Sequence, residues 1–381
     1  MTEKLFYQDP FLLDFTARVL SCQEGKDGWA VTLDRTAFYP EGGGQPADHG
    51  TLGDAAVTDT REKDGAIVHT CDRPLPVGQE VRGQVDAHRR LDLMQQHSGE
   101  HMVSGLICEA FHCDNVGFHI GHDLVTIDFN AQLTMVDVAE IEERVNRYIW
   151  ADRPVEITYP SPEALDALPY RSKKALDGQV RIVTWPGADC CACCGVHVRT
   201  SGQVGLVKLL SCQKFREGVR IEMAAGGRAL AYCSAVLEQN RQVSHLLSAK
   251  PLDTAAAVER LQRQIYQLQG RVMALEEGDF ARKAEQYAGA GDVLLLEGSM
   301  SSESLRKLCD AVQTTCGGRC AVFAGDGDAY QYAIGHPGGD LRDLVKALNA
   351  ALSGRGGGKP AFVQGSVRAT SSQIQSFFQG R

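Results

Sequence analysis

The chain has 381 residues, of which 43% are hydrophobic and 23% are charged, as in ordinary soluble globular proteins with two or three domains. Its formal net charge of −9 excludes a generally basic nucleic-acid coat, so any contact with RNA is expected to be local. No apolar run approaches the roughly 18 residues that span a bilayer, and the first residues lack a signal-peptide pattern. The thirteen cysteines therefore indicate a reducing cytoplasm, with metal binding or burial as their uses.

The first ninety residues are expected to be rich in β-strands. The segments that read as strands separated by turns are residues 29–33, 66–69 and 80–85. Between the first two lies the run Phe38-Tyr39-Pro40-Glu41-Gly42-Gly43-Gly44-Gln45. Three glycines allow positive φ and the close approach of a ligand or another chain. No Lys-Ser/Thr follows them, so they do not form a phosphate loop, and a tight turn in a small barrel is the simpler interpretation.

Two histidines one helical turn apart, His97 and His101, are the first candidate metal ligands. Residues 91–111 are predicted to be helical, because apolar residues recur there at helical spacing. Side chains at i and i+4 share one helix face and lie close enough to share a metal ion. Such a pair also arises by chance on a surface or in a core, so the metal interpretation depends on further ligands.

The chain then alternates between predicted strands and helices. The expected elements are a strand at 124–129, a helix at 136–150, and strands at 153–159 and 180–184. The side chains of Tyr170, Arg171, Lys173 and Lys174 add local positive charge before the last of these strands.

The segment Asp189-Cys190-Cys191-Ala192-Cys193-Cys194-Gly195-Val196-His197 supplies a second pair of ligand types at i and i+4, Cys193 and His197. It also holds two overlapping Cys-x-x-Cys pairs, so a redox pair or a separate zinc knuckle must be considered. The residues after this segment do not show a helical pattern, which a redox pair needs. A zinc knuckle needs a second, separate Cys-x-x-Cys, and the sequence has none. Joining Cys193 and His197 to the two upstream histidines is more economical, and this nitrogen-and-sulfur set suits tetrahedral Zn²⁺.

Two helices are predicted in the middle of the chain, at 229–249 and from Asp253 or Thr254 onward, separated by Pro251. Along the second helix, apolar residues follow spacings of 3 and 4, which is the a/d pattern of a coiled coil. These seam residues are Val258, Leu261, Ile265, Leu268, Val272 and Leu275. The pattern fits either dimerisation or packing against the first helix as an intrachain hairpin.

From Gly291 the pattern becomes α/β and leads into a second glycine run. Strands are expected at 293–296, 321–324 and 331–334, and helices at 302–314, 341–352 and 373–378. The glycine run reads as a loop, with basic residues and no acidic residue nearby. Those basic residues are Lys346, Arg355, Lys359, Arg368 and Arg381. Such a loop suits a phosphate backbone, although a solvated tail around a tight turn has the same composition.

Taken together, these motifs resemble the editing domain of alanyl-tRNA synthetases, and still more the free-standing alanyl-tRNA editing proteins called AlaX in their long form. The resemblance rests on the first glycine run with Gln45, the His-x-x-x-His, the Cys-x-x-x-His with Arg199-Thr200 after it, and Gly356-Gly357-Gly358-Lys359-Pro360. The family commonly has Cys-Gly-Gly-Thr-His where this chain has Cys193-Cys194-Gly195-Val196-His197. The ligand types are kept, but the hydroxyl before the last histidine is lost.

The resemblance implies an α+β chain of four parts. They are a glycine-rich β-barrel subdomain at 1–90, a zinc-binding editing core at 91–226, a helical coiled-coil arm at 227–290 and an α/β C-terminal tRNA-binding domain at 291–381. No aminoacylation domain is expected, because the chain opens directly on the barrel-like segment. The C-terminal domain would grip the tRNA body, and a homodimer through the arm and this domain is expected.

The implied activity is hydrolysis of the ester in tRNA(Ala) mischarged with serine or glycine. A synthetase pocket separates such small side chains only about 10- to 200-fold, so a second hydrolytic site is needed. The family motif suggests one Zn²⁺ held by His97, His101, Cys193 and His197. It further suggests Thr36 as partner of the serine hydroxyl, and Gln45 with the amides of Gly42, Gly43 and Gly44 as groups that orient the terminal adenosine or the oxyanion. Gly357, Gly358 and Lys359 are the candidate contacts to the tRNA body.

Two alternatives remain open at this stage. His97-Ser98-Gly99-Glu100-His101 also fits the H-x-x-E-H pattern of inverted zinc peptidases, with Glu100 as base. That family needs a glutamate as third ligand, and Glu142 or Glu143 lies too close to the pair in sequence to be convincing. The other alternative is a non-catalytic tRNA-binding or regulatory protein whose zinc is only structural.

Overall fold

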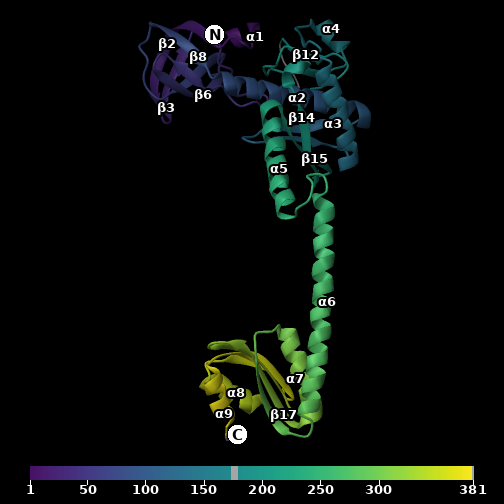
Figure 1. Ribbon diagram of the computed structural model, residues 1–381. Helices are drawn as coiled ribbons and strands as arrows, with labels where there is room; N and C mark the ends of the chain where they lie inside the picture. The colour runs from purple at the N-terminus through teal and green to yellow at the C-terminus, as the bar shows by residue number, and fades with distance from the viewer. Residues whose placement is uncertain (173–178, 380–381) are drawn as a thin grey trace. The chain divides into compact units, whose positions relative to one another are not determined.

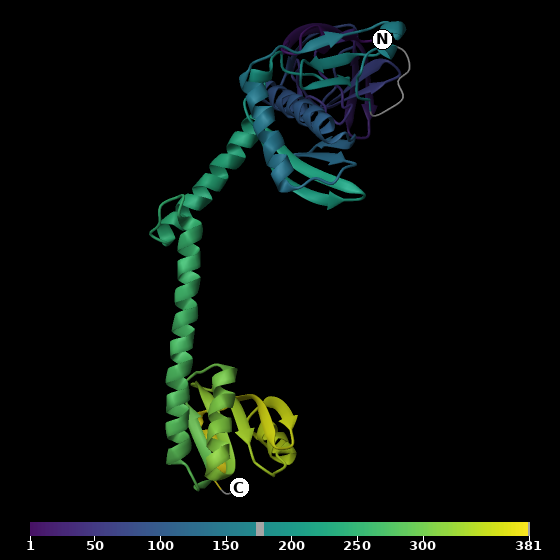
Figure 2. The same cartoon turned by 90° about the vertical axis from the view of Figure 1, so that its right-hand side faces the viewer.

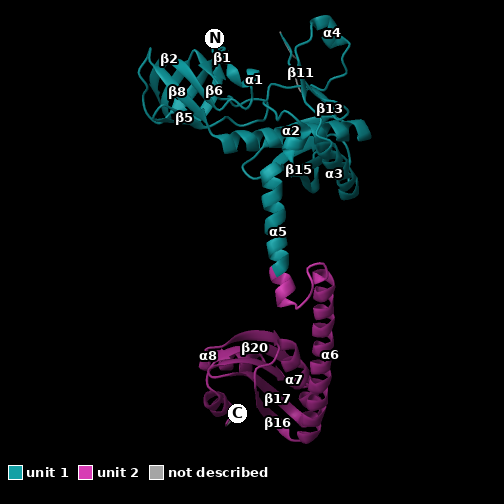
Figure 3. Cartoon of the chain, turned by 45° about the horizontal axis from the view of Figure 1, so that its top comes forward, with its two compact units in different colours: residues 1–241 teal, residues 242–381 magenta. Residues whose placement is uncertain are grey.

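The computed structural model describes residues 1–172 and 179–379, in two compact units, Met1–Arg241 and Gln242–Arg381 (Figure 3). Both units combine helices with β-sheets, in agreement with the mixed α and β composition expected from the sequence. Three basic residues of the expected charge clusters, Lys173, Lys174 and Arg381, lie outside the described residues. Among the described helices, none combines the length and the apolar character needed to cross a membrane.

The N-terminal unit begins with a closed six-stranded barrel (Figure 1). Its strands, in spatial order, are β2 (Asp14–Gly25), β3 (Gly28–Leu33), β7 (Ala66–Cys71), β6 (Ala55–Lys63), β5 (Gly50–Leu52) and β8 (Glu80–Val85). Alternate residues of β2 and β8 are buried, because successive side chains of a strand point to opposite faces. A short parallel pair, β1 (Glu3–Lys4) with β4 (Arg35–Thr36), and the helix α1 (Leu5–Gln8) lie beside the barrel.

Helix α2 (Ala87–Phe111) forms the spine of this unit. The Asp86 side chain caps its first turn by accepting a hydrogen bond from the Arg89 amide, and His112 ends it in a left-handed conformation with φ of 50°. The side-chain amide of Gln96 exchanges two hydrogen bonds, of 2.9 Å and 2.8 Å, with the backbone of Ala225. This double contact fixes the rotation of α2 about its axis against the neighbouring sheet.

That sheet has four antiparallel strands in the order β14 (Val207–Phe215), β15 (Gly218–Ala225), β10 (Val125–Phe129) and β9 (Asn115–Ile120). Helices α2 and α3 (Met135–Trp150) share one hydrophobic core with it. A three-stranded sheet of β11 (Glu156–Thr158), β12 (Ile182–Trp185) and β13 (Asp189–Ala192) brings β13 against α2. The remaining elements are α4 (Pro162–Asp166), a 3₁₀ turn (Ser201–Val204) and α5 (Gly226–Leu246).

The C-terminal unit is a five-stranded sheet covered by helices on both faces (Figure 2). Its order is β16 (Gly291–Glu297), β17 (Gly317–Asp326), β18 (Ala329–Gly335), β20 (Phe362–Arg368) and β19 (Arg355–Lys359), with only the first pair parallel. The core of one face includes Phe280 of α6 (Thr254–Gln286) and Leu308 of α7 (Ser302–Cys316). The other face packs on α8 (Arg342–Ala351) and α9 (Ser371–Phe378).

The second glycine run is not a loop, as its composition suggested, but the edge strand β19. Gly356, Gly357 and Gly358 pair in antiparallel register with Gly365, Gln364 and Val363 of β20. Glycine has no side chain to show strand alternation, so its sequence pattern does not distinguish a loop from an edge strand.

The seam residues of α6 form an exposed apolar face. Val258, Leu261, Ile265, Leu268, Val272 and Leu275 have exposed fractions between 40% and 75%. Within the C-terminal unit, helix α6 therefore leaves its heptad pattern uncovered.

Candidate metal centre

His97 and His101 lie on the buried face of α2, each with only 2% of its surface exposed. Their ring centroids are 5.2 Å apart, as the i, i+4 spacing requires. Burial of two imidazoles side by side is costly unless their polar nitrogens find partners.

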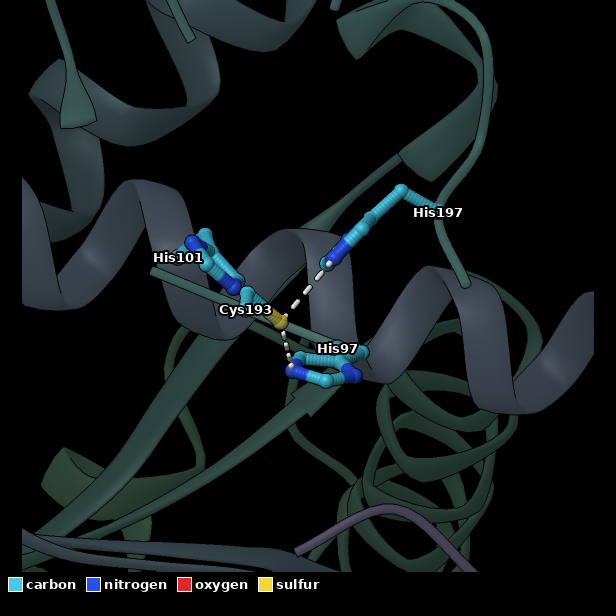
Figure 4. Close-up of side chains that lie close together, drawn as sticks. All are labelled: His97, His101, Cys193 and His197. Atoms are coloured by element: carbon cyan, nitrogen blue, oxygen red, sulfur yellow. Dashed lines mark hydrogen bonds between the residues drawn. The ribbon is translucent and has the colours of Figure 1, made fainter. Parts of the chain in front are cut away.

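The loop after β13 brings Cys193 and His197 to the same place (Figure 4). The Cys193 Sγ atom lies 3.5 Å from His97 Nε2 and 3.5 Å from His197 Nε2. One candidate ligand atom from each of the four residues lies within 4.8 Å of the other three. Metal–ligand bonds of 2.0–2.3 Å in a tetrahedron separate the ligand atoms by about 3.5 Å, so this group fits Zn²⁺. His97, His101, Cys193 and His197 are called the His/Cys group below.

Gly195 allows the loop to cross this closely over α2. A Cβ atom at that position would lie 2.1 Å from His97 Cε1 and 3.0 Å from the Gln45 side-chain oxygen. Any other residue would therefore push the loop, and with it Cys193 and His197, away from the helix.

Each histidine of the group has a polar partner at Nδ1. His97 Nδ1 lies 2.7 Å from Gln45 Oε1, His101 Nδ1 lies 2.7 Å from Asp189 Oδ2, and His197 Nδ1 lies 3.2 Å from Ser98 Oγ. Acceptors at Nδ1 hold the proton there and leave the Nε2 lone pair free for a cation, an arrangement common around metal-bound histidines. The outer hydrogen bonds thus orient all three imidazoles toward one point.

The charges around the His/Cys group favour the ligand forms of Cys193 and His197. At His101, burial lowers the pKa, but Cys193 and Asp189 outweigh it and raise the pKa to about 10, so a cation must displace a proton from that imidazole. Burial would raise the pKa of the Cys193 thiol, but the imidazoles of His97, His101 and His197 lower it well below its ordinary value. Burial lowers the pKa of His197 to about 3, so this imidazole is neutral near pH 7. Thiolate and neutral imidazole are the forms that bind Zn²⁺.

Asp189 also joins the His/Cys group to Arg171. Its two oxygens accept hydrogen bonds of 2.7 Å and 2.8 Å from Arg171 Nε and Nη2. Burial would raise the pKa of Asp189, but the hydrogen bonds from His101 and Arg171 lower it below its ordinary value. The carboxylate therefore stays charged beside His101 at neutral pH.

The first glycine run is a tight turn that sets Gln45 against His97. Gly42 and Gln45 exchange backbone hydrogen bonds across the turn, at 3.1 Å and 3.0 Å. Gly44 has φ of +86°, and a Cβ there would come within 2.5 Å of the Phe118 ring, which itself stacks 5.1 Å from His97. Gln45 Oε1 is used by His97 and the Val196 amide, whereas Gln45 Nε2 is buried without a partner among the described residues.

Thr36 lies in the barrel core, and its hydroxyl contacts none of the His/Cys group. Its Oγ1 atom is 2.8 Å from His69 Nε2 and accepts a hydrogen bond from the Phe38 amide at 3.1 Å. His69 Nδ1 lies 3.1 Å from the Val31 carbonyl, to which it donates, so Nε2 is the acceptor of the Thr36 proton. One lone pair of the Thr36 oxygen is left for a further donor.

The second predicted contact region lies in the C-terminal unit, whereas the His/Cys group lies in the N-terminal unit. Gly357, Gly358 and Lys359 line a hollow of about 480 Å³ together with Arg306 and Phe362. The Arg306 guanidinium carbon lies 5.7 Å from the Phe362 ring centroid, and Asp310 is the acidic residue of the hollow. Two cations and an aromatic ring form a surface suited to a nucleic-acid backbone and base.

The residues needed by the alternative activities are engaged elsewhere. Glu100 Oε1 accepts hydrogen bonds from Ser104 Oγ at 2.8 Å and from Asn115 Nδ2 at 2.6 Å, which hold it apart from the His/Cys group. Glu142 binds Lys208 and the Leu209 amide, so it is not a third ligand to the histidine pair. Cys190 and Cys191 lie on β13 with no helix after them, contrary to a redox Cys-x-x-Cys.

Sequence reasoning did not single out Asp189, Ser98 or Arg181 as functional residues. Ser98 adjoins His97, and Asp189 is an acidic residue four positions before Cys193. Closeness in sequence to the metal-ligand motifs was therefore the signal that could have identified both residues.

Two family models match parts of the chain that contain these motifs. The model of class II (A) tRNA synthetases matches residues 5–89, which include the first glycine run. The model of the threonyl and alanyl tRNA synthetase second additional domain matches residues 180–222, which include Cys193 and His197. AlaX-L, the alanyl-tRNA editing protein of Pyrococcus horikoshii, is 28% identical over 98% of this chain and 96% of its own length. The chain is therefore similar to a long alanyl-tRNA editing protein along nearly the whole of both sequences.

Ligases are related to the chain through part of their length. The alanine–tRNA ligases of Halorubrum lacusprofundi and Pyrobaculum neutrophilum are 31% and 32% identical over 96% of this AlaX-like chain. The chain spans only 42% and 43% of those two ligases. The C-Ala domain of Aquifex aeolicus alanyl-tRNA synthetase aligns with 23% of the chain at 20% identity and covers 91% of that domain, with a TM-score of 0.21, too low to establish a shared fold.

Proposed function

We propose that this protein is a zinc-dependent deacylase that hydrolyses the ester of tRNA(Ala) mischarged with serine or glycine. The observation that carries the proposal is the convergence of His97, His101, Cys193 and His197 from distant segments into one group of metal-ligand geometry. The resemblance to AlaX-L along nearly the whole of both chains supplies the substrate class. The localisation that we propose is the cytoplasm, where translation supplies that substrate.

Bound zinc would supply Lewis acidity, either to the substrate's amino group or to the attacking water. The chain's own groups bind and orient. Gln45 Oε1 fixes His97, and we propose that the buried Gln45 Nε2, a donor without a partner among the described residues, stabilises the oxyanion of the ester. In the turn formed by Gly42, Gly43 and Gly44, the amides of Gly43 and Gly44 are the further candidate donors, because the Gly42 amide donates to the Gln45 carbonyl.

Discrimination against correctly charged alanine needs a hydrogen-bond partner for the serine hydroxyl, because size alone separates the two weakly. Thr36 stays our proposed partner. Its proton is directed to His69, so the remaining lone pair would accept the serine hydroxyl proton. In the C-terminal unit, Gly357, Gly358 and Lys359 are proposed to contact the tRNA body through the hollow that they line.

We further propose a homodimer through the exposed seam of α6. Six apolar residues at heptad spacing are 40% to 75% exposed, and a second copy of the same helix presents the complementary pattern. Fewer than three heptads make a weak isolated coiled coil, so the dimer also needs contacts of the C-terminal unit.

The deacylase proposal is tested with His101→Ala, with His122→Ala as a matched control on an exposed loop histidine. The wild-type protein is expected to carry about one zinc and to release serine from mischarged tRNA. His101→Ala should lose both zinc and activity, and His122→Ala should keep both. Normal zinc content together with normal deacylation in His101→Ala would reject the assignment, and zinc without any deacylation in the wild type would favour a structural role.

A further inference from the structure

Arg181 is a buried cation that meets no carboxylate among the residues that the structure describes. It lies just before β12, and only 8% of its surface is exposed. Its Nη1 donates two hydrogen bonds, to the Cys193 carbonyl at 2.8 Å and to the Gly195 carbonyl at 3.0 Å. Its Nε is buried without a partner among the described residues. A buried charge is costly unless an opposite charge meets it.

Four other arginines in the same unit, which range from buried to partly exposed, show what this guanidinium lacks. Each of them places the fork formed by Nε and Nη2 on an aspartate carboxylate. These pairs are Arg90 with Asp48, Arg171 with Asp189, Arg220 with Asp128 and Arg228 with Asp92. The same fork of Arg181 meets no carboxylate in the described chain. This is the edge of arginine that binds carboxylates and phosphates through two parallel hydrogen bonds.

Neighbouring contacts hold Arg181 in place beside the His/Cys group. The Tyr7 ring stacks on it, with the guanidinium carbon 4.9 Å from the ring centroid. The Tyr7 hydroxyl donates to the Cys194 carbonyl at 2.8 Å, and burial raises the pKa of Tyr7, so this hydroxyl keeps its proton. Three successive carbonyls, of Cys193, Cys194 and Gly195, are thus bound by Tyr7 and Arg181. The fork is preorganised next to a metal-ligand residue.

The local charge balance favours an anionic ligand. Zn²⁺ with one thiolate and three neutral imidazoles carries a net charge of about +1, while Asp189 and Arg171 cancel each other. Arg181 adds a second positive charge. In an aminoacyl-tRNA the amino acid's carboxyl group is esterified and its amino group is cationic, so the negative charges of the substrate are its phosphodiesters. The phosphodiester nearest the reacting ester is the one that joins the terminal adenosine to the preceding nucleotide.

We propose that the Nε–Nη2 fork of Arg181, backed by the Tyr7 ring, binds the phosphate on the 5′ side of the terminal adenosine of the tRNA. This inference rests on the proposed function for the identity of its ligand. It assigns a binding residue that is separate from the four metal ligands. It also explains why a buried arginine lies between α1 and the loop that carries Cys193.

The test compares binding of adenosine 5′-monophosphate and adenosine to the zinc-loaded full-length protein by calorimetry. The wild type is expected to bind the monophosphate about 10- to 100-fold more tightly, as for a hydrogen-bonded charge pair. Arg181→Gln should reduce this preference to less than about threefold while zinc content stays at the wild-type level. Equal affinities for the two probes in the wild type would overturn the proposal, whatever the variants do.

Two control variants separate phosphate binding from loosening of the loop. Tyr7→Phe removes the hydrogen bond to the Cys194 carbonyl but keeps the ring and Arg181, so it should keep the preference for the monophosphate. Arg82→Gln removes an exposed charge that is paired with Asp14 on the barrel, and should also keep it. If Arg181→Gln loses zinc, Arg181→Lys, which keeps the charge but lacks the fork, replaces it and should lose most of the preference. Loss of the preference in Tyr7→Phe, or its retention in the zinc-loaded arginine variant, would refute the role of the fork.

A competition experiment distinguishes a site for the end of an RNA from a site for a free nucleotide. The trinucleotide CCA should displace the monophosphate from the wild type, and failure to do so would overturn the assignment to the tRNA end. These results are independent of hydrolysis. A protein that prefers the monophosphate but leaves mischarged tRNA intact would reject the deacylase and keep the phosphate site, and the reverse pair of results would do the opposite.

Discussion

His101 Nδ1 lies 2.7 Å from Asp189 Oδ2, and this contact joins helix α2 to strand β13 inside the candidate metal centre. The carboxylate holds the proton on Nδ1, so Nε2 of His101 is presented to the cation. Arg171 holds the other side of the carboxylate, which prevents it from turning away.

Asp189→Asn is expected to lower zinc affinity about 10- to 100-fold, as is usual when the outer partner of a ligating histidine is removed. The asparagine side chain is neutral, so it no longer supplies the negative charge that the aspartate offers to the His101 ring and the Arg171 guanidinium. Competition with a chromogenic chelator measures the change. Asp128→Asn is the matched control, because Asp128 is also held by an arginine, Arg220, but contacts none of the metal ligands. Equal losses in both variants would show that Asp189 acts only through general stability.

Gln45→Glu is expected to keep zinc and to lower the deacylation rate about 100-fold. Glutamate retains the acceptor for His97 Nδ1 but lacks the donor that Gln45 Nε2 provides, and removal of one oxyanion donor costs about 100- to 1000-fold in other hydrolases. Single-turnover release of serine from mischarged tRNA, beside zinc analysis, measures both quantities. A zinc-loaded variant with the wild-type rate would exclude the amide from the reaction.

His69 is expected to make the N-terminal unit less stable as the pH falls from 6.5 to 4. Burial lowers its pKa from 6.5 to about 4 in the folded protein, so in this interval the unfolded chain binds a proton that the folded chain does not. The stability is therefore fully present above pH 6.5 and decreases as the pH falls, by about 3 kcal/mol in total. Urea unfolding of the wild type and His69→Gln between pH 4.5 and about 7.5 gives the difference in slope. His122→Gln, an exposed control, should follow the wild type. Parallel curves for wild type and His69→Gln would contradict the prediction.

Ile265→Lys is expected to convert the proposed dimer into a monomer. A charged side chain in the seam of α6 must be desolvated when two helices pair, at a cost that a short coiled coil cannot offset. Sedimentation at matched concentrations measures the mass. Gln267→Lys places the same charge on the exposed helix away from the seam and should leave the dimer intact. A wild-type chain that sediments as a monomer would exclude the seam as an interface.

The sequence by itself determined the features that depend on local geometry and residue type. The i, i+4 spacing fixed His97 and His101 on one face of α2, because an α-helix has 3.6 residues per turn. The same spacing and the ligand chemistry singled out Cys193 and His197, and the order of the motifs pointed to the long alanyl-tRNA editing proteins. The prediction of a loop at the second glycine run was wrong, because glycine has no side chain that would show strand alternation. The pairing of β19 with β20 that makes this run a strand is a contact between two segments.

Only the tertiary structure decided which atoms surround those ligands. The partners of His97 and His101 lie 52 and 88 residues away in the chain, on the glycine turn and on β13. The unpaired fork of Arg181 is likewise visible only once the loop of Cys193 is folded against it. Hydrogen bonds between such distant groups are set by how strands and helices pack, which no spacing within a single segment encodes.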